Sequence, residues 1–222
     1  MNRARLKLEN GPFVAGVLSS LEGNIPLAGD IVEVRLDKMR RPADWLERCR
    51  AIESGGKPVL LTIRLRSEGG EWPADDEARL ALYEQGLEAV SAVDVELNSR
   101  ICADVMRAAK KLGKVCLVSL HDFEKTPPLA ELGSIVERVW QNGAVPKVAT
   151  MLRSEADVQT LRALLAAKRA GPLCVIGMGD GWRQTRVEFP KLGSCLTYGY
   201  LDRSTAPGQI SAAELSRQVH AP

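Results

Sequence analysis

The feature that most constrains the fold is an alternation of strand-like and helix-like segments along the whole chain. Eight short runs rich in β-branched and other apolar residues recur at fairly even intervals. They are residues 13–19, 31–37, 58–65, 92–98, 114–121, 144–151, 172–179 and 194–201. Most are separated by longer segments with helical apolar spacing, such as 75–90, 103–112 and 154–170. This alternation predicts an α/β protein, a (β/α)8 or TIM barrel, and 222 residues suffice for one.

Glycines and linkers agree with this organisation. Gly55-Gly56, Gly113, Gly143 and Gly171 stand where a left-handed residue would end a helix before the next strand. The segment 21–30 is too short for a full helix, so a turn is expected there. Residues 1–10 precede the repeat, and we expect a short extra strand or an ordered arm that closes the barrel bottom. No flexible linker divides the chain, which predicts a single domain over residues 1–222.

Composition excludes several classes of partner. The 30 basic and 28 acidic residues leave a net charge of only +2, which argues against a nucleic-acid or membrane-surface partner. No segment approaches the ~20 uninterrupted apolar residues of a membrane helix. The cysteines are scattered and form no C-x-x-C pair, which argues against a metal site and against disulfides. We therefore expect a cytoplasmic protein that acts on a small molecule. The cysteines are Cys49, Cys102, Cys116, Cys174 and Cys195.

Lys147 is the most unusual residue of the predicted strands. It interrupts the apolar run 144–151, where a cation must be paired, desolvated or used in chemistry. A lysine amine in such surroundings can attack a carbonyl carbon and form a Schiff base. A lysine at a strand end can also simply extend its ammonium to solvent. Lys147 alone leaves these two interpretations open.

Ionisable residues accumulate at the ends of the predicted strands, where a barrel of this type builds its active site. Alternation within 33–37 places Glu33, Arg35 and Asp37 on one face of their strand. His121 ends the fifth run, next to the strand that carries Lys147, and a histidine can move protons near neutral pH. Such charged residues are unusual in core strands and favour an active site. The others are Arg64, Glu68, Asp94, Glu96 and Asp122.

Several ordered motifs together resemble type I 3-dehydroquinate dehydratase, a Schiff-base (β/α)8 lyase of the shikimate pathway and of aromatic amino acid biosynthesis. The resemblance spans roughly residues 13–210. It departs at Pro146, where the family usually has an aliphatic residue, and at Thr205, which keeps the hydroxyl of the usual serine. The motifs are E-x-R-x-D at 33–37, T-x-R-x-x-x-E-G-G at 62–70, D-V-E-L at 94–97, S-L-H-D-F at 119–123, T-P at 126–127, K-V-A at 147–149, G-M-G at 177–179 with Arg186 beyond it, G-S at 193–194 and A-P-G-Q at 206–209.

The resemblance implies a role for each matching residue. Lys147 would form an imine with the C3 ketone of 3-dehydroquinate, His121 would remove the C2 proton, and Glu68 would orient His121. Arg186 would bind the substrate carboxylate. The remaining substrate-binding residues would be Glu33, Arg35, Arg64, Thr205 and Gln209. Neither a metal nor an organic cofactor is needed, and the family often forms homodimers, which is expected here.

Two alternatives remain from the residues alone. A class I aldolase shares the sixth-strand lysine, but it commonly needs a phosphate cradle after the seventh and eighth strands. A barrel that only binds quinate-like ligands, as a sensor or scaffold, would not need both His121 and Lys147. The dehydratase reaction itself serves both aromatic biosynthesis and quinate breakdown, and the sequence is compatible with either.

Overall fold

Eight parallel strands form one sheet in the computed structural model, which describes residues 6–21, 26–39, 43–73, 75–167, 170–204 and 209–221. The strand order is β7-β6-β5-β4-β3-β2-β1-β8, so chain neighbours are spatial neighbours. Every pairing is parallel, as in the predicted (β/α)8 barrel. The strands are β1 Phe13–Leu18, β2 Ile31–Arg35, β3 Val59–Thr62, β4 Ala92–Glu96, β5 Val115–Asp122, β6 Val145–Met151, β7 Cys174–Met178 and β8 Leu196–Tyr200.

The sheet closes between β7 and β8 through a side chain rather than through a regular ladder. The backbone N–H of Cys195 donates to the Leu173 carbonyl at 2.8 Å, just before both strands begin. The fully buried Ser194 hydroxyl accepts from the Val175 N–H at 2.9 Å and lies 3.0 Å from the Leu196 carbonyl. Because β7 and β8 do not pair regularly here, the Val175 N–H and the Leu196 carbonyl have no backbone partner across the gap among the described residues. The Ser194 hydroxyl forms hydrogen bonds with both groups instead.

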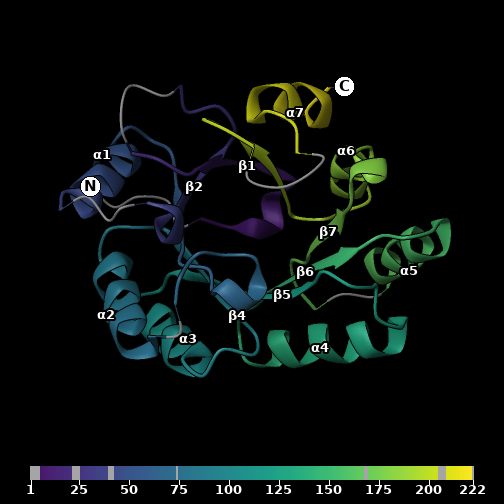
Figure 1. The fold of residues 1–222 in the computed structure, drawn as a ribbon, viewed down its shortest axis with the longest axis horizontal. Coiled ribbons are helices and arrows are strands. Elements are labelled where there is room, and N and C mark those ends of the chain that lie inside the picture. The colour runs from purple at the N-terminus through teal and green to yellow at the C-terminus, as the bar shows by residue number, and fades with distance from the viewer. Residues whose placement is uncertain are drawn as a thin grey trace.

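Helices surround the strands, as Figure 1 shows. They confirm the predicted segments 75–90, 103–112 and 154–170, although the last helix ends earlier than predicted. Between β1 and β2 no helix occurs in the described residues, in agreement with the turn expected over 21–30. The α-helices are α1 Trp45–Ser54, α2 Asp76–Leu87, α3 Cys102–Lys111, α4 Leu129–Gln141, α5 Glu155–Ala166, α6 Thr185–Lys191 and α7 Ala212–Val219; the 3-10 turns are η1 Leu8–Asn10, η2 Leu36–Lys38, η3 Arg66–Glu68 and η4 Asp180–Trp182.

Local signals fix several of the helix ends. Asp75 caps α2 by accepting from the Ala78 N–H at 3.0 Å. Gly56, Gly113 and Gly143 have positive φ angles just after α1, α3 and α4, as predicted. The prediction for Gly171 was wrong, because α5 already ends at Ala166 and Gly171 has no positive φ.

The barrel interior changes from apolar at the bottom to polar at the top. The lower part is filled by apolar side chains from the strands, including Ile31, Leu60, Leu117 and Leu196. Leu8 of η1 is 2% exposed and packs against this cluster, so the described part of the predicted arm, residues 6–10, closes the bottom without forming an extra strand; residues 1–5 lie outside the described residues. Above this layer many of the inward side chains are ionisable, and the site lies there.

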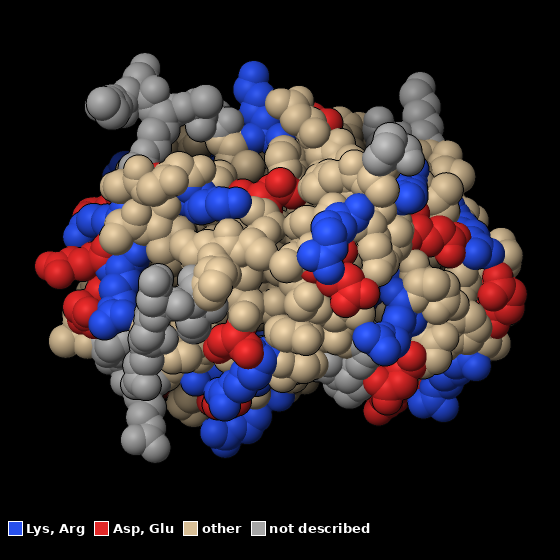
Figure 2. Space-filling view, turned by 90° about the horizontal axis from the view of Figure 1, so that it is seen from above, with Lys and Arg blue, Asp and Glu red and all other residues tan. Residues whose placement is uncertain are grey.

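The outer surface mixes the two signs of charge. Figure 2 shows basic and acidic side chains interspersed over the face it presents, with no field of one sign. This distribution fits the small net charge. Within the described ranges no helix is long and apolar enough to span a membrane.

Candidate active site

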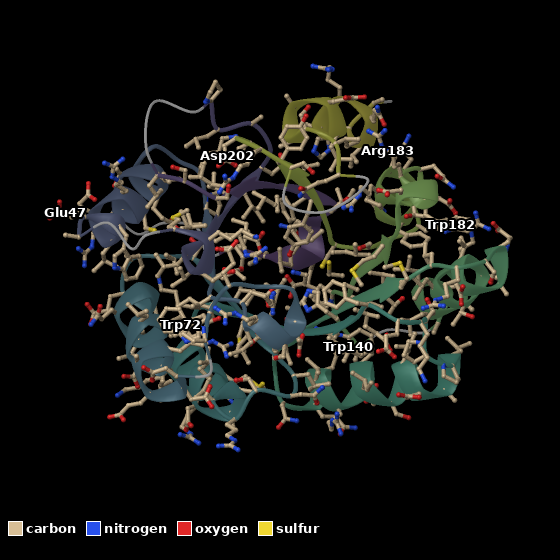
Figure 3. The ribbon with its side chains drawn as sticks, in the orientation of Figure 1. Glu47, Trp72, Trp140, Trp182, Arg183 and Asp202 are labelled. Atoms are coloured by element: carbon tan, nitrogen blue, oxygen red, sulfur yellow. The ribbon has the colours of Figure 1, made fainter. Side chains whose placement is uncertain are left out.

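A cavity of about 210 Å³ opens at the carboxyl ends of the strands. It brings together eight of the nine residues predicted for the site; the ninth, Thr205, lies outside the described residues. In Figure 3 strand side chains point into the space that the strands enclose, whereas Glu47 on α1 points outward. The cavity is lined by Val17, Glu33, Arg35, Arg64, Glu68, Gly69, His121, Phe123, Lys147, Ala149, Ile176, Met178, Arg186, Tyr198 and Gln209.

Two larger cavities, of about 400 and 560 Å³, lie near the arm at the opposite end of the barrel, and another of about 400 Å³ lies between α2 and α3. Their described walls contain neither a histidine nor a buried lysine. The smaller upper cavity is therefore the candidate site, because its side chains can carry out proton transfer and nucleophilic attack.

Lys147 is paired inside the barrel and does not extend to solvent. It pairs with Ser119 on β5 and Cys174 on β7, and the residue is 5% exposed. Its Nζ donates to Asp94 Oδ2 at 2.7 Å and lies 4.3 Å from the centroid of the Tyr198 ring. Pro146 occupies a ladder position next to Lys147 without turning the lysine away from the interior.

Asp94 is the anion at the centre of the site. Its Oδ1 accepts from Arg64 and from the Ser119 hydroxyl, both at 2.7 Å, while its Oδ2 accepts from Lys147. Burial acts to raise the pKa of Asp94, but the adjacent Arg64 and Lys147 cations lower it well below its usual value. Asp94 is therefore ionised and balances two buried cations.

A second set of charged residues, Arg64, Glu96 and Arg79, lies next to Asp94 on the side of β3 and β4. Arg64 also lies 3.2 Å from Glu96 Oε1, which accepts from the Leu65 N–H at 2.9 Å. The other oxygen of Glu96 accepts from Arg79 of α2. Because Leu65 leads into η3, this set of charged residues fixes the start of the turn that carries Glu68.

His121 and Glu68 form an acid–base pair. His121 Nδ1 lies 2.9 Å from Glu68 Oε2. Burial and the cations of Arg64 and Lys147 lower the pKa of His121 well below its ordinary value, so the imidazole is neutral near pH 7. Burial raises the pKa of Glu68 to about 7, against the opposing charge of Arg64. A neutral, oriented imidazole is suited to accept a proton.

The second strand supplies two polar side chains on neighbouring inward positions. Glu33 accepts from the Thr62 hydroxyl at 2.8 Å. Arg35 forms a two-point ion pair with Asp37, at 2.9 and 2.8 Å. β2 ends at Arg35, so Asp37 belongs to η2 and not to the strand that was predicted for it. Asp37 also accepts from the Glu71 N–H at 3.1 Å. The Glu71 contact holds Asp37 in place, and the ion pair with Asp37 holds Arg35 at the cavity wall.

Arg186 is a buried cation that lacks a carboxylate partner among the described residues. It is 8% exposed, and its guanidinium donates to the Tyr198 carbonyl at 3.4 Å. Burial and the nearby Arg183 lower its pKa, but a guanidinium stays charged in proteins. A buried, unpaired guanidinium beside a cavity is suited to bind an anionic ligand in two-point fashion.

The loop that follows β8 is tied to the barrel at both ends. Asp202, labelled in Figure 3, accepts from the Ser19 hydroxyl at 2.6 Å, and Arg203 Nε donates to the same hydroxyl at 3.2 Å. At the other end, the Tyr200 N–H donates to the Ile210 carbonyl at 3.1 Å. These contacts place Gln209 at the cavity wall.

Comparison with known proteins assigns the chain. The sequence profile of the type I 3-dehydroquinase family matches residues 11–221. This chain belongs to that family. A 3-dehydroquinate dehydratase from Methanosarcina barkeri is 38% identical over 204 residues, which cover 86% of this chain and 84% of that protein. One from Methanocella arvoryzae is 35% identical, with 86% of each chain covered. The crystal structure of the Geobacillus kaustophilus 3-dehydroquinate dehydratase superposes with a TM-score of 0.83 at 27% identity, covering 95% of this chain and 90% of that one.

Contacts of three residues in this type I 3-dehydroquinase were not predicted from the sequence. Asp94 was expected as an inward charge but not as the partner of Lys147, and neither Ser119 nor Tyr198 was given a role. The alternation Ala92-Val93-Asp94-Val95-Glu96 was the available signal, since it places Asp94 inside the barrel. Among the described residues no group of three or more His, Cys, Asp or Glu side chains is arranged to hold a metal ion.

Proposed function

We propose that this protein dehydrates 3-dehydroquinate to 3-dehydroshikimate through a Schiff base on Lys147. The observation that carries the proposal is the meeting, in one cavity, of a buried lysine amine with a neutral histidine that a carboxylate orients. The family match and the named relatives support the substrate and the overall reaction. They also favour this function over a class I aldolase, the first of the alternatives.

Imine formation is the first step of the proposed reaction. Lys147 passes a proton to His121, and the free amine attacks the C3 carbonyl carbon of the substrate. After proton transfer from nitrogen to oxygen, the neutral carbinolamine accepts the proton back from His121 on its hydroxyl and loses water. The product is an iminium cation on Lys147, which Asp94 faces at the nitrogen.

Elimination follows from this iminium, which acts as an electron sink. His121 takes the C2 proton, and the C–H electron pair moves toward nitrogen to give a neutral enamine. The enamine electrons then expel the C1 hydroxyl, which leaves as water with the proton that His121 holds. Water finally hydrolyses the conjugated iminium, releasing 3-dehydroshikimate and the Lys147 amine.

The remaining cavity residues are proposed to bind the substrate. Arg186 takes the carboxylate, because its guanidinium has no ionic partner among the described residues. Glu33, Arg35 and Arg64 hold ring hydroxyls from the second and third strands. Gln209, and with it Thr205, closes over the substrate from the last loop. None of these steps requires a metal or an organic cofactor.

The experiment that tests this function combines an activity assay with chemical trapping. Production of the conjugated enone is followed in the ultraviolet, and the intact mass is measured after borohydride reduction with 3-dehydroquinate. We expect activity and a covalent adduct for the wild type and for Lys191→Ala, whose lysine is exposed on α6. Lys147→Ala should show neither. A folded wild type with no enone product and no adduct contradicts the proposal and returns the aldolase and the non-catalytic ligand-binding barrel to consideration.

We also propose that the protein acts as a cytoplasmic homodimer in the shikimate pathway. A groove between α2 and α3 supports a second copy as the partner, because acidic Glu84 and Glu88 line one side, whereas basic Arg107 and Lys111, together with Asp104, line the other. Leu112 beside them is 47% exposed. The charge reversal Lys111→Glu should convert a dimer to a monomer in light scattering, whereas Arg138→Glu on α4 should not. A wild type that is monomeric at micromolar concentration refutes the dimer.

A further inference from the structure

Tyr198 forms the wall of the cavity beside the amine of Lys147. It lies in β8, where it pairs with Ala15 of β1, and it is 5% exposed. Lys147 Nζ lies over the ring, 4.3 Å from its centroid. Because both groups are buried, little water competes for the cation at this contact.

The ring is the second source of negative potential at the Lys147 nitrogen. The first is Asp94, at 2.7 Å, but that carboxylate is shared with Arg64 and Ser119. The face of an aromatic ring carries partial negative charge, and its attraction for a cation is strongest where water is excluded. Tyr198 therefore stabilises positive charge on Lys147 in addition to Asp94.

The two stabilising groups respond differently when the ammonium becomes an iminium. An ammonium has three N–H donors, while the iminium nitrogen keeps one, so hydrogen bonding to Asp94 becomes more dependent on geometry. The attraction to a ring face needs the charge but no N–H donor. The carbinolamine and the enamine are neutral at nitrogen, so the ring face stabilises them little.

We propose that the face of the Tyr198 ring stabilises the iminium on Lys147 relative to the neutral carbinolamine and enamine, and so raises the share of the iminium among the covalent species on Lys147. This inference rests on the imine chemistry proposed above. It gives a role to a residue whose backbone carbonyl also accepts from Arg186, so β8 contacts both the amine and the carboxylate-binding guanidinium.

The hydroxyl of Tyr198 is not the source of this effect. Its oxygen is buried and has no hydrogen-bond partner among the described residues. Burial raises the pKa of the phenol well above its usual value, with a further contribution from Cys174, so the ring is uncharged. The interaction is therefore that of a neutral ring face with a cation, which ring fluorination weakens stepwise without changing the shape of the side chain much.

The test replaces Tyr198 by phenylalanine and by phenylalanines that carry one, two and three ring fluorines. The quantity measured for each variant is the fraction trapped by borohydride at a saturating 3-dehydroquinate concentration, where the iminium competes with the neutral carbinolamine and enamine. We expect the ratio of trapped to untrapped enzyme to fall steadily with fluorine number, by about threefold to thirtyfold over the series, which corresponds to the range of cation–π energies. The same series at Phe13, a partly buried residue that packs against the lower apolar cluster away from the cavity, should give no trend.

A second variant keeps the test decisive if a fluorinated protein is unstable. Tyr198→Leu has no ring face, so the fraction of iminium that borohydride traps in it should be no larger than in the trifluorinated variant. A flat fluorine series, or trapping by Tyr198→Leu equal to that of Tyr198→Phe, overturns the role of Tyr198 while leaving the imine chemistry intact. Absence of an adduct in the wild type instead removes the proposed function itself.

Discussion

Replacing Asp94 by asparagine keeps the shape of the side chain and removes the one charge that balances Lys147. Asp94 is 0% exposed and accepts three bonds of 2.7 Å, from Lys147, Arg64 and Ser119. Arg64 keeps Glu96 at 3.2 Å, but Lys147 has no other carboxylate partner among the described residues. The substitution therefore leaves a buried ammonium without its ion pair.

The expected cost follows from this geometry. Breaking a buried ion pair by removing one partner costs about 3–5 kcal/mol, because the other charge stays buried and uncompensated. Against a total free energy of unfolding of about 5–15 kcal/mol, such a loss is large. Asp44→Asn is the matched control, since Asp44 pairs at 2.7 Å with Arg48 on the surface at the start of α1, at side-chain exposures of 46% and 42%. That pair should contribute little to stability, because water screens an exposed ion pair.

Urea denaturation of both variants measures these differences, with m-values compared to exclude a change in the unfolded state. The pKa of Asp94 is lowered in the folded protein, so its contribution to stability is present above the unfolded-state pKa of about 4 and is lost as pH falls further. The difference between wild type and Asp94→Asn should therefore shrink below about pH 4. A difference under about 1 kcal/mol at pH 7 would refute the reasoning that Asp94 is an essential buried counter-charge.

Three further outcomes are expected. The pKa of Glu68 is raised to about 7 while that of His121 is lowered, and the two shifts change stability with pH in opposite directions, so the prediction concerns a difference: the stability of the wild type minus that of Glu68→Gln, from urea titrations, should decrease as pH rises from the unfolded-state pKa of Glu68 to 7, and a difference independent of pH contradicts it. Arg186→Lys should raise KM for 3-dehydroquinate about tenfold or more in steady-state assays, because one two-point contact is lost, and an unchanged KM removes Arg186 from carboxylate binding. Ser194→Ala should lower the free energy of unfolding by about 1–3 kcal/mol, because the buried N–H of Val175 loses its acceptor, whereas exposed Ser134→Ala should change it by less than about 0.5 kcal/mol; equal effects contradict the closing role of Ser194.

Much of the fold follows from the sequence, because strand-like runs and helical spacing report directly on which side chains are buried. The predicted strands at 58–65 and 31–37 were nevertheless too long. β3 ends at Thr62, since the Ile63 N–H lies 3.1 Å from the Tyr83 hydroxyl and the Ile63 carbonyl accepts from Arg79 at 2.9 Å. Tyr83 and Arg79 come from α2, and they bind the backbone groups of Ile63 that would otherwise pair with a neighbouring strand. A contact of this kind between distant segments cannot be predicted from the local sequence pattern. The single-domain prediction over 1–222 stays a prediction.

The candidate site was predictable as a set of residues but not as a set of contacts. Alternation places Glu33, Asp94 and Lys147 inside the barrel without saying which of them pair. The Asp94–Lys147 contact joins positions 53 residues apart, and it depends on the tilt and register of β4, β5 and β6. The position of Tyr198 against Lys147 depends in the same way on how β8 closes the barrel.

Peptide mapping after borohydride reduction with 3-dehydroquinate tests the assignment of Lys147 most directly. The reduced adduct is stable, so tandem mass spectrometry can place it on one side chain. We predict a single modified residue, Lys147, with trypsin failing to cleave after it. An adduct on another lysine, with Lys147 unmodified in an active enzyme, would contradict the Schiff-base assignment.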